Sequence, residues 1–162
     1  MTQLLPEKSA VVARLQSVVQ SELDSMESLA EMARDEATST ETKSEGKYDT
    51  RATEASYLAR GQAWRITELR KLVAWLSSDT AKRIVENGVV QVGALVRIEG
   101  ARNEIVYVAP IGGKQATING EIVRLISPAS PLGSSMAELE VGDGFEVESP
   151  RGVLEYEVTA VG

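Results

Sequence analysis

The sequence contains neither cysteine nor histidine, and these two absences exclude several classes of functional site. Without cysteine there is no disulfide, no thiolate metal ligand and no cysteine nucleophile. Without histidine there is no imidazole general acid–base catalysis and no histidine-ligated zinc. A metal ion bound by this chain must therefore be a hard ion with oxygen ligands, such as Mg²⁺.

Aromatic residues are scarce, with one phenylalanine, two tryptophans and four tyrosines in 162 residues. So few rings cannot line a large pocket, which disfavours an enzyme that encloses an organic substrate. The chain also lacks an N-terminal signal and an apolar run long enough to cross a membrane. We therefore expect a cytoplasmic protein without membrane contact.

Basic residues are in the minority: 17 lysines and arginines face 24 acidic residues, and the net charge is −7. This balance excludes a duplex-DNA binder held mainly by phosphate contacts. The length is sufficient for one ordinary domain or two small ones.

Two long helical patterns occupy the first part of the chain. Pro6 is suited to the first turn of a helix, and apolar residues then recur in the three- and four-residue steps of a coiled-coil seam. In the first pattern the seam residues are Val12, Val19, Leu23, Met26, Ala30, Ala33 and Ala37. In the second they are Ala52, Ala55, Ala59, Gln62, Ile66, Leu69, Val73 and Leu76.

These patterns predict an antiparallel helical hairpin. Seam residues are small near the reversal and large away from it in both helices, so small residues meet small ones only if the helices run in opposite directions. The alanines would then allow a close approach near the tip. The first arm is acidic outside and the second is basic, which favours pairing between them, although each exposed pair contributes little. Thirty helical residues rise roughly 45 Å, a projection suited to reaching into a large partner.

Residues 39–49 form the predicted loop, because serine, threonine, glycine and mixed charges continue neither seam. Asp49 or Thr50 is placed to cap the second helix. Asn87-Gly88 ends the helical part with a left-handed residue. We place the domain boundary between Leu76 and Gly88, which gives a coiled-coil hairpin over 1–80, with its tip at about 39–50, and a second domain over 88–162.

After the boundary the hydrophobic period changes from about 3.6 to 2. Gly112-Gly113-Lys114 lacks the strand–loop–helix context of a phosphate loop and is interpreted as a turn. Asn119-Gly120 predicts a tight hairpin turn. The pattern indicates a small antiparallel sheet with one short helix over Ser134–Leu139, an α+β domain. The predicted strands are Leu95–Glu99, Glu104–Val108, Glu121–Ile126, Phe145–Ser149 and Val153–Val161.

The C-terminal part resembles the C-terminal domain of the bacterial Gre (GreA/GreB-like) transcript cleavage factors. The segments that carry the resemblance are Ile126-Ser127, Ser130-Pro131-Leu132-Gly133, Val141-Gly142-Asp143, Pro150-x-Gly152 and Leu154–Val158. That domain is similar to the FK506-binding-protein (FKBP) fold. The resemblance covers the whole chain, because a helical hairpin precedes this domain in the same order and at a similar total length.

The resemblance implies a function. Gre factors bind bacterial RNA polymerase at the rim of its secondary channel, and acidic residues at the coiled-coil tip help to hold a second Mg²⁺ at the polymerase active site. This stimulates cleavage of backtracked RNA by the polymerase itself, so the factor is not an enzyme and binds no cofactor stably alone. Contact with the nascent RNA would be indirect. A monomer is expected, although Leu4, Leu5 and Trp75 are available for a dimer.

The tip residues are placed by matching the family pattern to Thr53–Tyr57. Asp49 and Glu54 are the best candidates for a pair of catalytic, metal-holding acids, and Glu45 and Glu41 are the next candidates. When Tyr57 is matched to the tyrosine of the family tip, Asp49 and Glu54 each lie one position from an acidic residue of that tip, in opposite directions. The loop before them is several residues longer than in the family. The structural alternative is a helix cap at Asp49 and a solvated acid at Glu54 that complements the helix dipole.

Ser130 and Pro131 occupy the loop that in the family meets the polymerase, and they are the predicted partner-binding residues. Their alternative is an ordinary loop before a helix.

Three other functions stay open. A Gre-like regulator would occupy the channel and inhibit or tune the polymerase without stimulating cleavage, and the displaced tip acids favour it. A prolyl isomerase is suggested by the fold similarity, but such pockets are lined by aromatics and this domain has only Tyr107, Phe145 and Tyr156. The last is a coiled-coil module with a different partner.

Overall fold

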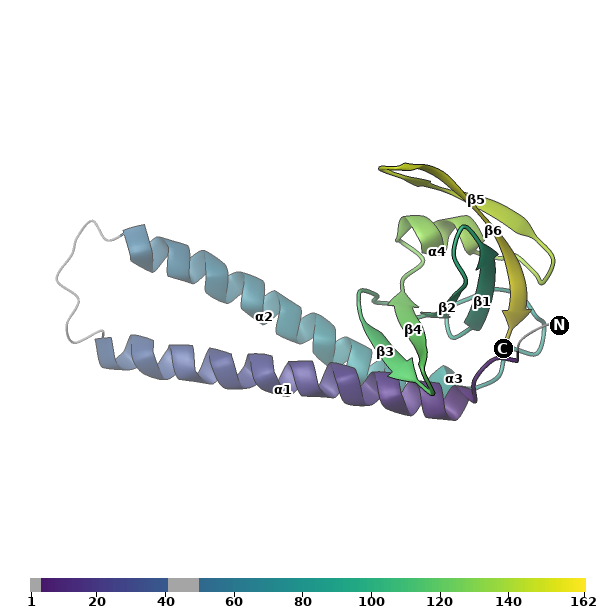
Figure 1. Cartoon of the computed structure of the whole chain (residues 1–162). Coiled ribbons are helices and arrows are strands. Elements are labelled where there is room, and N and C mark those ends of the chain that lie inside the picture. Colours follow the sequence, from purple (N-terminus) through teal and green to yellow (C-terminus); the bar gives the residue numbers. More distant parts are fainter. Residues whose placement is uncertain (1–3, 41–49) are drawn as a thin grey trace.

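The computed structural model describes residues 4–40 and 50–162, and the side chains of these residues other than 37–40 and 50–56. A helical hairpin projects from a small sheet domain (Figure 1). The hairpin consists of α1 (Lys8–Thr40) and α2 (Thr50–Leu76), and the short helix α3 (Asp79–Lys82) follows it. The expected fold class, an N-terminal two-helix hairpin followed by an α+β domain, is confirmed.

The first long helix reaches further toward the tip than the sequence predicted. The first continues to Thr40, so Ser39 and Thr40 are helical rather than part of the loop. The second begins at Thr50, directly after the predicted loop. No glycine or proline occurs between Pro6 and Gly46, and serine and threonine reduce helix stability only modestly. The sequence therefore contains no strong signal that would end α1 before Thr40.

The hairpin is packed at its base and open further out. Val19 and Leu23 of α1 are buried together with Ile66 and Leu69 of α2, as the seam predicted, and Leu15 is buried with them. Toward the tip the ribbons separate (Figure 1), and Ala33 and Ala59 are exposed. The predicted close approach of alanines is therefore wrong for these two residues. Burying a lone methyl group stabilises packing by only about 0.8 kcal/mol, which is little to hold two helices together.

Six strands form one sheet in the order β3-β4-β2-β1-β6-β5. Most neighbours are antiparallel, as expected, but β2 and β4 are parallel. This pair results from an additional strand, β3, which the sequence did not predict and which reverses the chain before β4. The strands are β1 (Leu95–Gly100), β2 (Glu104–Val108), β3 (Gln115–Ile118), β4 (Glu121–Ile126), β5 (Gly144–Ser149) and β6 (Gly152–Val161).

The predicted turns are confirmed, but the short helix lies three residues earlier than predicted. Asn119 and Gly120, with φ angles of 51° and 81°, connect β3 to β4, as a type I′ hairpin turn requires. Gly88 has a φ of 67°. The helix α4 spans Pro131–Met136 rather than Ser134–Leu139, because Ser130 caps its N-terminus and Pro131 suits its first position.

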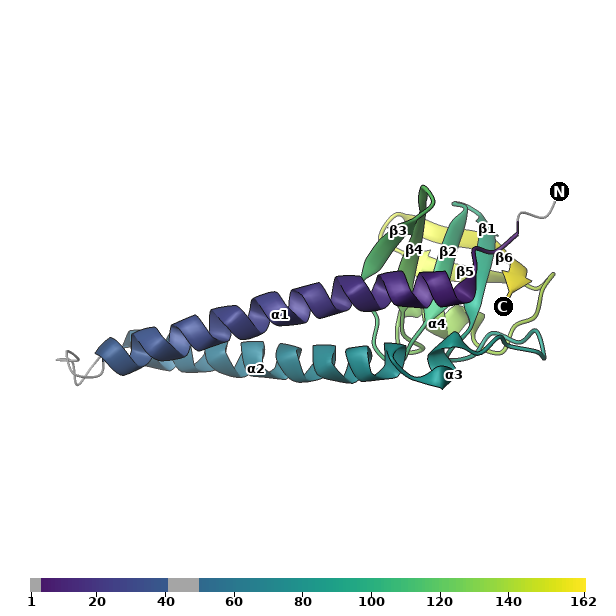
Figure 2. The ribbon, with the colours of Figure 1, turned by 90° about the horizontal axis from the view of Figure 1, so that it is seen from below.

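The sheet has a hydrophobic core on each face. Leu95 of β1 faces the hairpin, whereas its neighbours Val96 and Ile98 face the side covered by α4. The hairpin-side core contains Val11 and Leu15 of α1 as well as strand residues. In the view from below, α1 crosses the sheet (Figure 2). The two predicted domains therefore share one core at the hairpin base, where α1 and α2 pack on the sheet.

Two polar side chains are buried where the hairpin meets the sheet domain. The Tyr107 hydroxyl donates a hydrogen bond to the Ala81 carbonyl at 2.8 Å and accepts one from the Trp75 indole at 3.3 Å. Burial raises the pKa of Tyr107 to about 12. Lys8 donates to the carbonyls of Arg83 and Gly162, and burial lowers its pKa to about 8.

Of the three residues considered for a dimer, Leu5 and Trp75 pack against the shared core, and Leu4 is exposed. Among the described residues, no helix is both long and apolar enough to cross a membrane.

Candidate functional site

In the sequence, the predicted acidic residues lie between the two described helix ends that are farthest from the sheet, or just after the second of them. The helices end there at Thr40 and begin again at Thr50 (Figure 1). Glu54 lies in the second turn of α2. Asp49, Glu45 and Glu41 lie outside the described residues, so their roles and that of the Glu54 side chain stay predictions. Within the described part of the chain, no cluster of three acidic residues is arranged to hold a metal ion.

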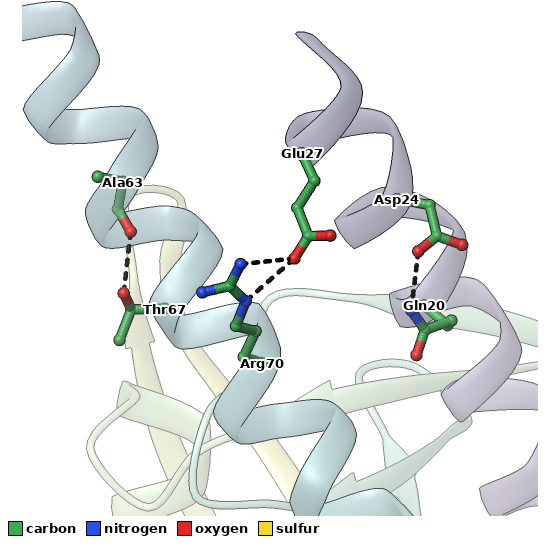
Figure 3. Close-up of polar contacts among 6 residues, drawn as sticks. All are labelled: Gln20, Asp24, Glu27, Ala63, Thr67 and Arg70. Atoms are coloured by element: carbon green, nitrogen blue, oxygen red, sulfur yellow. Dashed lines mark hydrogen bonds and ion pairs between the residues drawn. The ribbon is translucent and has the colours of Figure 1, made fainter. Parts of the chain in front are cut away.

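Ion pairs connect the acidic arm to the basic arm, as predicted. Glu27 of α1 accepts from the Arg70 guanidinium of α2 at 2.9 and 3.0 Å (Figure 3). Glu22 pairs with Arg65 at 3.6 Å and also with Lys114 of the sheet domain. These side chains are partly exposed, so each pair contributes at most about 1 kcal/mol. Their main effect is to set the register of α1 against α2 and the sheet.

Beyond these ion pairs, the hairpin leaves large apolar side chains uncovered. Five of them are between 60% and 68% exposed: Leu29, Met32, Tyr57, Leu58 and Trp64. Two of them, Tyr57 and Leu58, line a groove of about 720 Å³ together with Met26, Gly61, Gln62 and Arg65. The Arg60 guanidinium lies 5.6 Å from the centre of the Tyr57 ring. Exposed apolar side chains that line a groove, as Tyr57 and Leu58 do, are typical of interaction surfaces.

The loop before α4 places the predicted partner-binding residues. The Ser130 hydroxyl accepts from the Gly133 amide at 3.0 Å and donates to the Ser127 carbonyl at 2.7 Å. Ser130 is thus the N-cap of α4, in line with the structural alternative for this residue. Pro131 is the first residue of the helix and is exposed. Capping occupies the Ser130 hydroxyl, so the Pro131 ring is the part of the loop that is available to a partner.

Ser130 and Pro131 also form one wall of a cavity of about 840 Å³ between the loop, β4 and the β5–β6 hairpin. Its apolar lining includes Leu132, Val147 and Leu154. Four cationic residues line it as well, and Glu104 is the one carboxylate that the described part of the chain contributes. The four are Arg102, Lys114, Arg124 and Arg151. The cavity is therefore basic, in a chain that is acidic as a whole.

A small network of hydrogen bonds and an ion pair forms part of the cavity wall. Arg124 pairs with Glu104 at 2.6 Å, and the Tyr156 hydroxyl donates to the same carboxylate at 3.3 Å. Burial, followed by the negative charge of Glu104, raises the pKa of Tyr156. The Phe145 ring stacks on the Tyr156 ring with centroids 5.5 Å apart. Because Tyr156 is only 7% exposed, this network is part of the wall rather than an open aromatic surface.

Sequence analysis identified one wall of this cavity but missed its charge. The four cations come from the β1–β2 turn, the segment before β3, β4 and the β5–β6 turn. Residues so widely spaced leave no motif, and no local signal could have grouped them. The position of Gly112 requires glycine, because a Cβ atom there would lie 2.8 Å from the Ser127 nitrogen. The glycine lets its loop approach the end of β4 and bring Lys114 to the cavity.

Residues 85–162 match the family described as transcription elongation factor GreA/GreB, C-terminal domain. The chain matches no curated protein sequence at a significant level.

Among solved structures, the chain is similar to Gfh1 from Thermus aquaticus, with 19% identity over 92% of this chain and 94% of that chain and a TM-score of 0.37. It is similar to GreA factor homolog 1 from Thermus thermophilus, with 20% identity over 92% and 95% of the two chains and a TM-score of 0.36. It is also similar to transcription elongation factor GreA/GreB from Nitrosomonas europaea, with 24% identity over 68% of this chain and 92% of that chain and a TM-score of 0.35.

Proposed function

We propose, from the match of residues 85–162 to the GreA/GreB C-terminal domain, that this chain is a Gre-family transcription elongation factor that binds bacterial RNA polymerase at the secondary channel. The sheet domain, taken here as FKBP-like, docks at the rim through the loop around Pro131. The hairpin enters the channel and stimulates the polymerase to cleave backtracked RNA. The protein acts in the cytoplasm, contacts the nascent RNA only indirectly, and supplies groups to another enzyme rather than being one.

The observation that carries this proposal is the shape of the hairpin. Its base is fastened to the sheet by a shared core, whereas the helix ends at Thr40 and Thr50 lie far from the sheet (Figure 1). The 33 residues of α1 span about 50 Å. Between base and tip, large apolar side chains such as Trp64 have no cover from the described part of the chain. A channel wall would cover them and leave the acidic end near the polymerase active site.

The proposed chemistry needs only well-placed carboxylates. Two metal ions stabilise the attacking and leaving oxygens in such a hydrolysis, and carboxylates are preferred ligands of Mg²⁺. The polymerase holds one ion by itself. Asp49 and Glu54, with Glu45 beside them in sequence, would share the second ion with the polymerase and only in the complex. The factor alone would then hold no metal.

The second candidate is a Gre-like regulator that occupies the channel without stimulating cleavage. One observation favours it: Asp49 and Glu54 are each displaced by one position, in opposite directions, from the acidic positions of the family tip. A carboxylate that misses its position by more than about half an ångström no longer ligates productively. Such a protein would still bind and would slow initiation or elongation.

RNA cleavage in artificially backtracked polymerase complexes distinguishes the two candidates. We expect the wild-type protein to stimulate cleavage and Asp49→Ala and Glu54→Ala to lose the stimulation, with Glu45→Ala showing a smaller loss. Glu31→Ala is the matched control, because Glu31 is an exposed acid of α1 away from the tip. Binding of the wild type without stimulation would identify the regulator instead.

A further inference from the structure

The cavity beside the Ser130–Pro131 loop has a charge opposite to that of the whole chain. Four cationic residues and one carboxylate line it, although acidic residues outnumber basic ones by 24 to 17 in the sequence. Basic groups drawn from four separate segments thus meet at one concave site. Such a site concentrates negatively charged groups locally, even when the protein around it repels them.

Two of the four cations are available to a ligand. Lys114 is paired with Glu22, and Arg124 is paired with Glu104. The guanidinium groups of Arg102 and Arg151 form no ion pair with another described residue, and both residues are exposed. Arg102 lies on the β1–β2 turn and Arg151 on the β5–β6 turn. The cavity therefore has an unpaired arginine on each of two turns that line it.

The rest of the lining indicates what else the ligand must contain. Leu132 and Leu154 are half-buried, and Val147 is 8% exposed, so the cavity offers apolar contact as well as charge. A volume of about 840 Å³ is large for an inorganic ion and suits several side chains. Single-stranded RNA would need exposed rings for base stacking, but Tyr156 is buried against Phe145. These features favour a polypeptide.

We propose that this cavity binds an acidic segment of RNA polymerase, with carboxylates at Arg102 and Arg151 and an apolar side chain against Leu132 and Leu154. The inference rests on the proposed function, because it assumes the polymerase as partner. Arginine is suited to this role since its planar guanidinium binds a carboxylate through two parallel hydrogen bonds. The exposed Pro131 ring lies on the same cavity wall, so the loop and the arginines would form one docking surface.

The test is the affinity of the full-length protein for purified polymerase core enzyme, measured at low and high salt. The variants are Arg102→Glu, Arg151→Glu and their combination, with the milder Arg102→Gln and Arg151→Gln in case a reversal disturbs the adjacent turn. Arg14→Glu is the matched control, because Arg14 is exposed on α1 and does not line the cavity. Poly-glutamate and a single-stranded RNA oligonucleotide serve as competitors of wild-type binding.

We expect the double reversal to weaken binding about tenfold or more at low salt and to reduce its salt dependence, since charged pairs at an interface govern both. Arg14→Glu should bind like the wild type, and poly-glutamate should compete better than RNA. If the wild type binds and the cavity variants bind equally well, the inference is wrong and the proposed function stands. If RNA competes and poly-glutamate does not, the cavity is a nucleic-acid site. If the wild type does not bind, the proposed function and this inference both fail.

Discussion

Two glycines of this chain lead to opposite expectations for the same substitution. A Cβ atom on Gly133 would lie 1.9 Å from the Ser127 carbonyl oxygen, inside the turn capped by Ser130. A Cβ atom on Gly61 would meet nothing within 4 Å, on an exposed part of α2. Gly133 is thus required for the close approach of α4 to the preceding loop at Ser127, whereas Gly61 only reduces the stability of a helix.

We therefore predict that Gly133→Ala lowers the free energy of unfolding by at least ~2 kcal/mol, because backbone atoms must move apart. Gly61→Ala, the matched control, should raise it by roughly 0.5–1 kcal/mol. Urea denaturation followed by circular dichroism measures both. Equal stability of the two variants would show that the turn adapts to the extra methyl group.

Lys8 leads to a prediction about pH. Its pKa is lowered from 10.5 to about 8 by burial, so between these values the unfolded chain holds more protons than the folded one. The free energy of unfolding therefore rises with pH in this window, by at most about 1.4 kcal/mol per pH unit. Below pH 8 the cost of burying the charged amine is present in full.

The test compares the free energy of unfolding of the wild type and Lys8→Met between pH 8 and 10. Above pH 10, Tyr107 also contributes, because burial raises its pKa from 10.0 to about 12 in the folded protein. We expect the stability difference between the two proteins to change with pH in this window, the wild type gaining as pH rises. Subtraction cancels the titration of all other groups. A difference independent of pH would mean that Lys8 titrates normally in the folded protein.

The hairpin helices have a packing gradient along their length. Buried side chains of the shared core extend on α1 only to Leu23 and begin on α2 at Ile66. Further toward the tip, the described side chains are half-buried at most. Helices of this composition gain most of their stability from packing, so the outer turns should be less stable than the base.

Hydrogen exchange measured by mass spectrometry tests this gradient. We expect backbone amides in residues 24–36 and 57–65 to exchange markedly faster than those of the basal turns, because local opening costs less where few contacts must break. The buried strand β2 provides an internal reference for slow exchange. Uniform protection along both helices would contradict the gradient and indicate that the outer turns are held by contacts absent from this structure.

The elements themselves were largely predictable from periodicity, and the failures have two causes. The strand β3 has only four residues, Gln115–Ile118, which is too short for a clear alternation. The predicted start of α4 missed the cap because Ser130-Pro131 was interpreted through its resemblance to a docking loop. The parallel pairing of β2 with β4 follows from β3, so missing that strand also gave the wrong direction for one pair of neighbours.

At the scale of the whole molecule, the main difference from expectation is the junction of the two domains. The sequence predicted a hairpin and a sheet domain joined at a boundary between Leu76 and Gly88. In the structure, α1 packs across one face of the sheet, and the Tyr107 hydroxyl contacts Ala81 and Trp75. The hairpin is therefore held at a set angle by its base.

The sequence by itself determined the features that repeat locally or resemble a known pattern. These are the two helical arms of opposite charge, the change to a hydrophobic period of 2, the tight turns at glycine, and the family that the C-terminal domain resembles. Only the tertiary structure decided which faces meet. It joined the two domains through one core, left Ala33 and Ala59 of the seam exposed, and brought four cationic residues between Arg102 and Arg151 to one cavity. Periodicity reports only which side of an element is apolar, whereas packing and long-range charge depend on how distant segments are brought together.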